Sequence, residues 1–463
     1  MTAEMSSFFA SDWKFMIFLL YFYLERKGVN RMKRISWKNS DAASELNALY
    51  NRPACPPEIE KNVATIVAEV RENGNRAISG FLARFDKVEL KPEEFVVGQE
   101  ELAECEAAVD RTAKDSIAMA IAHVTEFAQA AKPKDHSFSP REGVVLGERF
   151  LPMDRIGCYI PGGTAPLVST VIHTVAIAKA AGVREIVAAT PPMKNGKVNP
   201  ATLYALKQAG ATEVWKLGGA YAVAALAFGT ETLRKVEKIV GPGNAYVAAA
   251  KKLVYGSVAI DMVAGPSEIM IIADSSANPV FAAADMLSQA EHGSGLEQSV
   301  LVSDSAEFLD KVEAELKRQS ASLPRLATVE KVLANGTFMI EAENMISAAE
   351  IAGNYAPEHL EVMCGNPREL LPHIKAAGAI FLGSWTPEPA GDFTAGPSHV
   401  LPTAGTAKFF HGLSTADFMR RSSLLEYTKD ALMKEVSAIE CFASLEGLAA
   451  HGRSASIRRD QKK

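Results

Sequence analysis

The sequence predicts an α/β protein with two Rossmann-like, doubly wound domains and small helical N- and C-terminal extensions. Three observations predict this fold class. Apolar strands alternate with helical segments from about residue 150 to 275, and the alternation resumes at EIMIIAD (268–274), as expected for parallel sheets covered by helices on both faces. Glycine-rich turns follow several of these strands, as ligand-binding turns do in doubly wound sheets. Beyond Pro402 the sequence changes to short helical segments, which we expect to pack on a neighbouring subunit.

The composition is that of a soluble globular protein. The chain has 463 residues, of which 48% are hydrophobic and 22% are charged, enough for two or three domains with a sizeable core. Its formal net charge of -6 argues against a nucleic-acid-binding protein, because the basic block is confined to a short C-terminal tail (458–463). The five cysteines form no CxxC pair, which indicates reduced thiols and a cytoplasmic location.

An apolar run near the N-terminus, FMIFLLYFYL (15–24), does not predict a membrane protein. Its ten residues are about half of the roughly 20 that a bilayer-spanning helix needs. Glu4 and Asp12 precede the run and Glu25-Arg26-Lys27 follow it, whereas a signal peptide needs early positive charge and a small-residue cleavage site. Met32-Lys33-Arg34 looks like a natural protein start. We therefore expect residues 1–31 to be a non-native or disordered extension, and the protein to have no membrane association.

The chain divides by composition into helical and mixed stretches. Apolar side chains follow helical spacing from about residue 40 to 130, and the tail is expected to include a helix at ADFMRRSSLLEYT (416–428). The expected units are an N-terminal helical arm (32–55), one discontinuous Rossmann-like domain (56–150 with 268–405), a second Rossmann-like domain (151–267) and a C-terminal helical dimerisation tail (406–463).

Three turns of the first α/β stretch are rich in glycine: IPGGTAP, KLGGAYA and VGPGNAY. Backbone amides at such turns and at helix starts are suited to bind phosphate. No GxGxxG motif occurs, so the standard dinucleotide fingerprint is absent and both Rossmann-like domains are incomplete in this respect. Glycines that only form tight turns remain an alternative interpretation.

SQAEHG (288–293) places Gln289 and His292 three residues apart at the end of a predicted helix. Positions i and i+3 share one helix face, so the two side chains can be directed at a common point. Asp392 in a GDF turn and His451 in EGLAAHGRS would add a carboxylate and a second imidazole, a set that suits zinc or manganese. Spacing alone leaves open the alternative of a plain helix end.

NYAPEHLE places Glu358 and His359 at a predicted helix start. Adjacent helix residues point about 100° apart, so the two side chains would act on different atoms. Histidine is the usual general base, and a carboxylate can activate water; a solvated helix start is the competing interpretation. His399 in GPSHVLPT and the segment AGPSE (264–268) lie in rigid loops, which either contact a substrate or only turn the chain.

Several segments, in the same order and register, closely resemble the histidinol dehydrogenase family. They are RIGCYIPGG, GPGNAYV, IDMVAGPSE, LSQAEHG, YAPEHLE, AGDFTAGPSHVLP, ADFMRRSS and EGLAAHGRS, and the resemblance covers about residues 35 to 460. It implies oxidation of L-histidinol to L-histidine through bound L-histidinaldehyde, with NAD as the oxidant and one zinc ion per subunit. It also implies a homodimer whose terminal extensions are exchanged, so that each active site is shared.

The resemblance implies a role for each matching residue. Glu358 is expected to activate water, and His359 to act as general base and contact the substrate. The expected zinc ligands, which also contact the substrate, are Gln289, His292, Asp392 and His451, the last supplied by the other subunit. Further substrate contacts are expected at Ser267, His399 and Glu446, and cofactor contacts at Tyr159, Tyr221 and Asn244.

One position departs from the family pattern. The family usually has a cofactor-contacting glutamine in a GGAQA turn, where this chain has Tyr221 in GGAYA, which puts cofactor affinity in doubt. Two other functions are alternatives: a paralogous zinc- and NAD-dependent dehydrogenase of another small polyol, such as a sulfonated diol, and a zinc hydrolase or non-catalytic metal-binding scaffold. The presence of Glu446, expected to bind the histidinol amine, favours histidinol.

Overall fold

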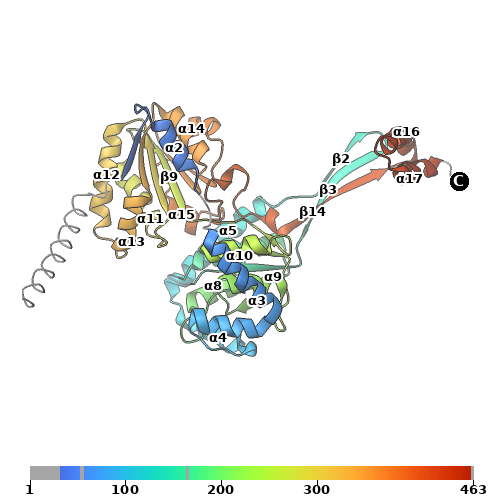
Figure 1. The fold of residues 1–463 in the computed structure, drawn as a ribbon, viewed down its shortest axis with the longest axis horizontal. Coiled ribbons are helices and arrows are strands. Elements are labelled where there is room, and N and C mark those ends of the chain that lie inside the picture. Colours follow the sequence, from blue (N-terminus) through green and yellow to red (C-terminus); the bar gives the residue numbers. More distant parts are fainter. Residues whose placement is uncertain (1–31, 53–56, 163–165, 460–463) are drawn as a thin grey trace, which may run out of the picture.

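The computed structural model describes residues 32–52, 57–162 and 166–459. The expected N-terminal extension, residues 1–31, lies outside these ranges. Two layered α/β bodies lie side by side, and a long arm projects from them and carries the C-terminal helices (Figure 1). The predicted α/β class, with parallel sheets covered by helices, is confirmed. In the described ranges no helix has both the length and the apolar character needed to cross a membrane.

The first body is built on an all-parallel sheet, sheet A, with the strand order β1-β11-β10-β9-β12-β13 in the described chain. Its strands are β1 (Lys33–Ser36), β9 (Glu268–Ala273), β10 (Gln298–Ser303), β11 (Thr337–Glu341), β12 (His359–Met363) and β13 (Ala379–Leu382). One face is covered by α11 (Pro279–Ala290), α12 (Ala306–Ser320) and α13 (Leu326–Asn335), and the other by α2 (Ala42–Tyr50) and α14 (Met345–Tyr355). Buried aliphatic residues of the strands alternate between these two faces, as a doubly covered sheet requires.

The second body has another all-parallel sheet, sheet B, with the order β6-β5-β4-β7-β8 within the described residues. Its strands are β4 (Arg155–Tyr159), β5 (Glu185–Ala189), β6 (Glu213–Trp215), β7 (Lys238–Val240) and β8 (Ala259–Ile260). One face packs on α3 (Pro57–Phe81), α9 (Gly219–Phe228) and α10 (Ala245–Val254). The other packs on α4 (Gln99–Ala108), α5 (Arg111–Ala130), α6 (Val168–Val171), η3 (Ile172–Ala176), α7 (Ile177–Ala181) and α8 (Pro200–Ala209).

The division of the chain between the two bodies differs from the predicted one. The sequence assigned 56–150 to the unit of 268–405, whereas α3, α4 and α5 pack on sheet B. The expected separate arm, 32–55, instead supplies β1, which pairs with β11, and α2, which covers sheet A. An amphipathic helix needs an apolar face to cover, and its pattern does not state which of two similar sheets provides it.

A third sheet forms the projecting arm. It joins β2 (His136–Arg141), β3 (Val144–Pro152) and β14 (Met419–Tyr427) in antiparallel pairs, and α16 (Lys429–Leu445) and α17 (Ala449–Arg459) lie at its tip (Figure 1). The helix expected at 416–428 is therefore wrong for its main part, because Met419–Tyr427 pairs along its length with β3. Inter-strand hydrogen bonds decide the conformation of this polar, weakly periodic segment.

Candidate active site

The catalytic pair expected from the sequence lies where β12 and β9 begin. Glu358 directly precedes β12 and His359 is its first residue, so the predicted helix start is wrong and the segment is a strand start. Successive side chains of a strand point to opposite faces, so the two still act in different directions. Both are buried, at 6% and 2% exposure. A solvated helix start, the competing interpretation, would leave both side chains exposed, so their burial argues against it.

Backbone atoms of Glu268 hold both members of the pair. The Glu268 amide donates to Glu358 Oε2 at 2.8 Å, and its carbonyl oxygen lies 3.1 Å from His359 Nδ1. A carbonyl oxygen only accepts, so Nδ1 must carry the hydrogen and donate. The other ring nitrogen, Nε2, is thereby directed at Asp392 Oδ1, 3.4 Å away. His359 therefore presents Nε2 as its working atom.

The described residues bring two of the predicted metal ligands, Gln289 and His292, into contact, and place Asp392 near enough for its charge to act on His292. Gln289 ends the last turn of α11, and its Nε2 lies 3.4 Å from Nδ1 of His292 just beyond the helix. Asp392 lies in the short helix α15 (Glu388–Phe393) rather than in the expected loop. The charge of Asp392 acts on His292, although desolvation outweighs it and lowers the pKa of that imidazole. His292 is therefore neutral and able to act as a ligand.

His399 joins the site from the loop after α15. Its Nδ1 donates to the backbone carbonyl of Asp392 at 3.1 Å, and its Nε2 lies 3.3 Å from Thr170 Oγ1 in the second body. Its ring stacks on His173, with centroids 4.5 Å apart. The predicted rigid histidine is thus fixed by both bodies, at the junction between them. His173, which sequence analysis did not single out, lies in the π-helical turn η3, a feature common at functional sites.

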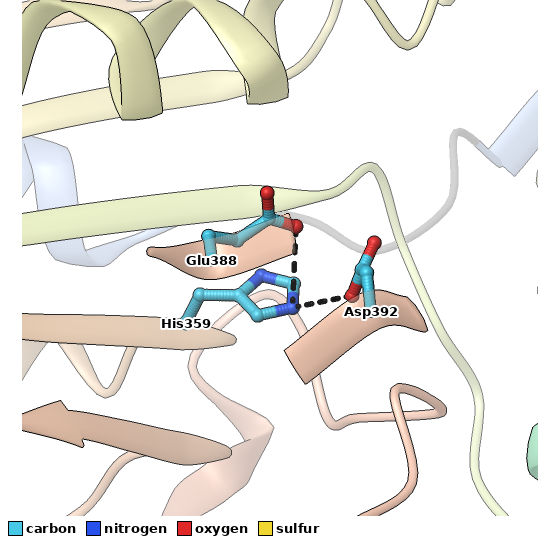
Figure 2. A group of neighbouring side chains, drawn as sticks. All are labelled: His359, Glu388 and Asp392. Atoms are coloured by element: carbon cyan, nitrogen blue, oxygen red, sulfur yellow. Dashed lines mark ion pairs between the residues drawn. The ribbon is translucent and has the colours of Figure 1, made fainter. Parts of the chain in front are cut away.

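Glu388 is the main site residue that sequence analysis missed. Figure 2 shows His359, Glu388 and Asp392 converging, with His359 Nε2 3.9 Å from Glu388 Oε1. Among the described His, Cys, Asp and Glu residues, these three form a group whose ligand atoms lie within 4.8 Å of one another. Glu388 accepts from Ser288 Oγ at 2.9 Å. Its spacing of four residues from Asp392 on one helix was the available signal.

The buried charges of this group shift one another's pKa values. Burial raises the pKa of Glu358 to about 8, with His359 opposing the shift. Burial alone would lower the pKa of His359, but Glu358 and Asp392 outweigh it and raise that pKa to about 10. The pKa of Asp392 shifts in the other direction. Burial would raise it, but the hydrogen bond to His359 and the charges of His399 and His359 outweigh burial and lower it. The site thus combines an ionised carboxylate with groups that titrate far from their usual range, which is common at functional sites.

The site fits a divalent metal ion by the chemistry of its donors. Gln289 is fully buried and its Oε1 has no hydrogen-bond partner among the described residues; the same is true of the buried His359 Nε2 and Glu388 Oε1. Buried polar atoms are normally paired, so these unpaired buried atoms fit a site that holds a cation. Amide oxygen, imidazole and carboxylate together suit zinc better than calcium.

The remaining predicted substrate contacts divide into one near residue and two distant ones. Ser267 directly precedes Glu268 and is partly exposed. His451 in α17 and Glu446 at the end of α16 are exposed at the tip of the arm, away from the site of their own chain (Figure 1). Within one chain, the structure does not bring them to the other ligands.

The predicted cofactor residues lie at the carboxyl ends of sheet B strands. The Tyr159 hydroxyl accepts from the Gly219 amide at 3.0 Å, and Asn244 caps α10 by accepting from the amides of Tyr246 and Val247. The Tyr221 hydroxyl instead donates to Asp86 Oδ2 at 2.6 Å, beside the Gly218 turn. Asp86 was not singled out from the sequence, because it lies more than a hundred residues away from the turn it borders.

The absence of a side chain at Gly241 allows the turn after β7 to approach the end of β4 closely. Its φ is +114°, and a Cβ there would collide with the carbonyl oxygen of Tyr159. Lys251 donates to the Gly241 carbonyl at 2.8 Å, and Asp261 accepts from the Gly241 amide at 2.8 Å. Lys251 and Asp261 also form a buried ion pair with each other, and this pair fixes the turn before Asn244.

Comparisons with known proteins agree on one family. The family model described as histidinol dehydrogenase matches residues 52–459. A histidinol dehydrogenase of Clostridium acetobutylicum is 46% identical over 401 residues, 87% of this chain and 92% of the relative. That of Bacillus subtilis is 42% identical over 421 residues, 91% and 98% of the two chains. A crystal structure of histidinol dehydrogenase from Elizabethkingia anophelis superimposes with a TM-score of 0.88 at 35% identity, covering 93% of this chain and 98% of that one.

Proposed function

Because this chain belongs to the histidinol dehydrogenase family, an oxidoreductase family of histidine biosynthesis, we propose that it oxidises L-histidinol to L-histidine through bound L-histidinaldehyde, using zinc and NAD. The observation that carries this proposal is the pairing of His359 with Asp392 beside the buried Glu358, with the Gln289–His292 pair near enough for the charges of Asp392 and His359 to act on His292. This set combines a base, a second base for water and metal-ligating donors within one site.

Gln289, His292 and Asp392 would hold the zinc ion, with His451 of the partner subunit as the fourth ligand. When bound, zinc would fix the imidazole and amine of the substrate, so that the carbinol carbon lies at the nicotinamide. His359 and Glu388 border this position and limit where the substrate can lie. His399, fixed between Asp392 and Thr170, would add a hydrogen bond to the substrate.

His359 acts in both oxidations. Its Nε2 would accept the hydroxyl proton of histidinol as the carbinol carbon gives up a hydride and becomes the aldehyde; NAD, when bound, would supply the hydride acceptor for both oxidations. Water then adds to the aldehyde, and Glu358 takes the proton that this water loses. In the second oxidation, Nε2 of His359 would accept a hydroxyl proton of the hydrate as the same carbon gives up its second hydride, which leaves the carboxylic acid. A carboxyl with a pKa of about 8 is a stronger base than an ordinary carboxylate, which suits the hydration step.

NAD would lie along the carboxyl ends of β4, β6 and β7, where Tyr159 and Asn244 support the turns. The hydroxyl of Tyr221 is hydrogen-bonded to Asp86, so Tyr221 borders this position together with that carboxylate. Where the family has a glutamine amide, this chain therefore has a tyrosine hydroxyl that is hydrogen-bonded to the Asp86 carboxylate.

A homodimer completes the site in this proposal. The arm exposes large apolar side chains: Leu425 is 70%, Phe442 65% and Leu445 78% exposed. Apolar patches of this kind on a projecting element favour burial against a second copy. Glu446 and His451 would then reach the partner's site, where Glu446 would bind the substrate amine.

The test is NADH absorbance on adding histidinol and NAD to the purified protein, with a sulfonated diol as the competing substrate. NADH formation from histidinol supports the proposal. Activity on the diol alone would replace histidinol with another polyol, and a metal-loaded dimer that forms no NADH from either substrate would overturn the dehydrogenase proposal.

A further inference from the structure

Arg52 and Glu268 form a buried ion pair directly behind the catalytic pair. The Arg52 guanidinium is bonded to both carboxylate oxygens of Glu268, by Nε to Oε1 and by Nη2 to Oε2 at 2.8 Å. The two side chains are only 10% and 4% exposed. A two-point contact between guanidinium and carboxylate fixes orientation as well as distance.

Further contacts hold this ion pair in one arrangement. Arg52 Nη2 donates to the Tyr355 carbonyl at 3.1 Å, and the guanidinium lies 3.6 Å from the centre of the Tyr355 ring. The amide of Ala404 donates to Glu268 Oε1 at 3.1 Å. The Glu268 side chain is therefore tied to α14, to the 404 loop and to the N-terminal segment that follows α2.

The backbone of the same residue contacts both catalytic side chains. Its amide donates to Glu358 and its carbonyl accepts from His359 Nδ1, at 2.8 and 3.1 Å. Glu268 is also the first residue of β9, where the ladder pairing with β10 begins. The orientation of the two peptide groups that flank the Glu268 Cα therefore determines where Glu358 and His359 point.

We propose that Arg52 and Glu268 are positioning residues, which fix the backbone on both sides of the Glu268 Cα and through it align Glu358 and hold the Nδ1–H of His359. This inference rests on the proposed function for its kinetic consequences alone. In the described ranges, the two side chains make no hydrogen bond to the expected metal ligands or to the cofactor turns of sheet B. Its loss should misalign both catalytic side chains together while leaving cofactor binding intact.

The test variant is Arg52→Met combined with Glu268→Gln, because removing one partner alone would leave a buried, unpaired charge that destabilises the fold. We expect kcat to fall at least about tenfold for the alcohol and aldehyde steps alike, as misplacement of a catalytic group does. The dissociation constant for NAD should change less than about twofold. Arg52→Lys, which retains a cation at Glu268, should recover part of kcat.

Arg155 with Glu213 provides a matched control. Arg155 is also buried and binds both oxygens of Glu213, at 2.7 and 2.9 Å, but at the start of β4, remote from the catalytic pair. Arg155→Met combined with Glu213→Gln should lower thermal stability comparably and leave both kcat values within about twofold.

A second measurement separates failure of this inference from failure of the proposed function. The Nδ1–H proton of His359, assigned by its loss in His359→Asn, should give a protected signal in the imidazole NMR spectrum. The signal should persist in the Arg155 control and in Arg52→Lys, and disappear in the Arg52/Glu268 double variant. A folded double variant that keeps this signal would overturn the inference, even if histidinol proved not to be the substrate. Equal loss of the signal or of kcat in the Arg155 control would also overturn it.

Discussion

His359 Nε2 lies 3.4 Å from Asp392 Oδ1, so the proposed base and a proposed metal ligand are direct neighbours. Asp392 and Glu358 together raise the pKa of His359 to about 10, against the lowering effect of burial. At neutral pH His359 is therefore protonated as long as the Asp392 charge is unopposed. The charge state of His359 must therefore depend on whether a cation is bound at Asp392.

Zinc binding should lower the pKa of His359. A cation held by Asp392 opposes the carboxylate charge and disfavours the imidazolium, so His359 loses its proton at a lower pH. An imidazole NMR titration of the zinc-loaded and chelator-treated protein measures this shift directly. A pKa of His359 that is the same in both forms would contradict the proposed metal position at Asp392.

Substituting the two catalytic residues should affect the two oxidations differently. His359→Asn should slow both steps at least about 100-fold, because each step needs Nε2 as the base. Glu358→Gln should slow the aldehyde step by a similar factor and the alcohol step far less, so that bound aldehyde accumulates. Single-turnover kinetics started from histidinol and from histidinaldehyde separate the steps. Equal losses for Glu358→Gln in both would rule out its role in hydration.

The exchanged arm predicts complementation between inactive subunits. His292→Ala and His451→Ala each remove one proposed zinc ligand, and His451 lies at the arm tip, exposed in its own chain. In a mixed dimer one of the two sites receives both native ligands, so activity should return to about a quarter of the wild-type value after random exchange. A His292→Ala/His451→Ala chain mixed with His292→Ala is the control that cannot recover. No recovery in mixed dimers of proven composition would refute the shared site.

Tyr221→Phe should act mainly on stability. The substitution removes the hydroxyl that donates to Asp86 at 2.6 Å but keeps the ring stacked on Phe81, with centroids 5.8 Å apart. Loss of a hydrogen bond to a partly buried carboxylate should lower the free energy of unfolding by about 1–3 kcal/mol. Denaturant unfolding and NAD titration measure the two effects. A rise of about tenfold in the NAD dissociation constant with unchanged stability would show a direct cofactor contact instead.

The sequence predicted the fold class and the local motifs of the site, but not how distant segments combine. Alternation of strands and helices sufficed for the two parallel sheets, and the i, i+3 pair Gln289 and His292 lies together as predicted. The helices within 57–130 were assigned to the other sheet, because amphipathic spacing shows an apolar face without showing its partner. The exchanged dimer remains a prediction.

The residues missed by sequence analysis act through contacts that carry little local signal, apart from the i, i+4 spacing of Glu388 and Asp392. Glu268 holds the catalytic pair with its backbone atoms, which any residue type possesses. Glu388 and Asp86 reach their partners across long sequence separations. The strand that begins at His359 was mistaken for a helix because Pro-Glu-His is also a common helix start, and pairing with β9 and β13 decides the conformation.

The stoichiometry of NADH formation tests the central claim most directly. A limiting amount of histidinol, incubated with excess NAD and zinc-loaded protein, should yield two equivalents of NADH and one of histidine. The yield should vanish after chelation and return on adding zinc. One equivalent of NADH with released aldehyde, or an unchanged yield after complete metal removal, would contradict the account.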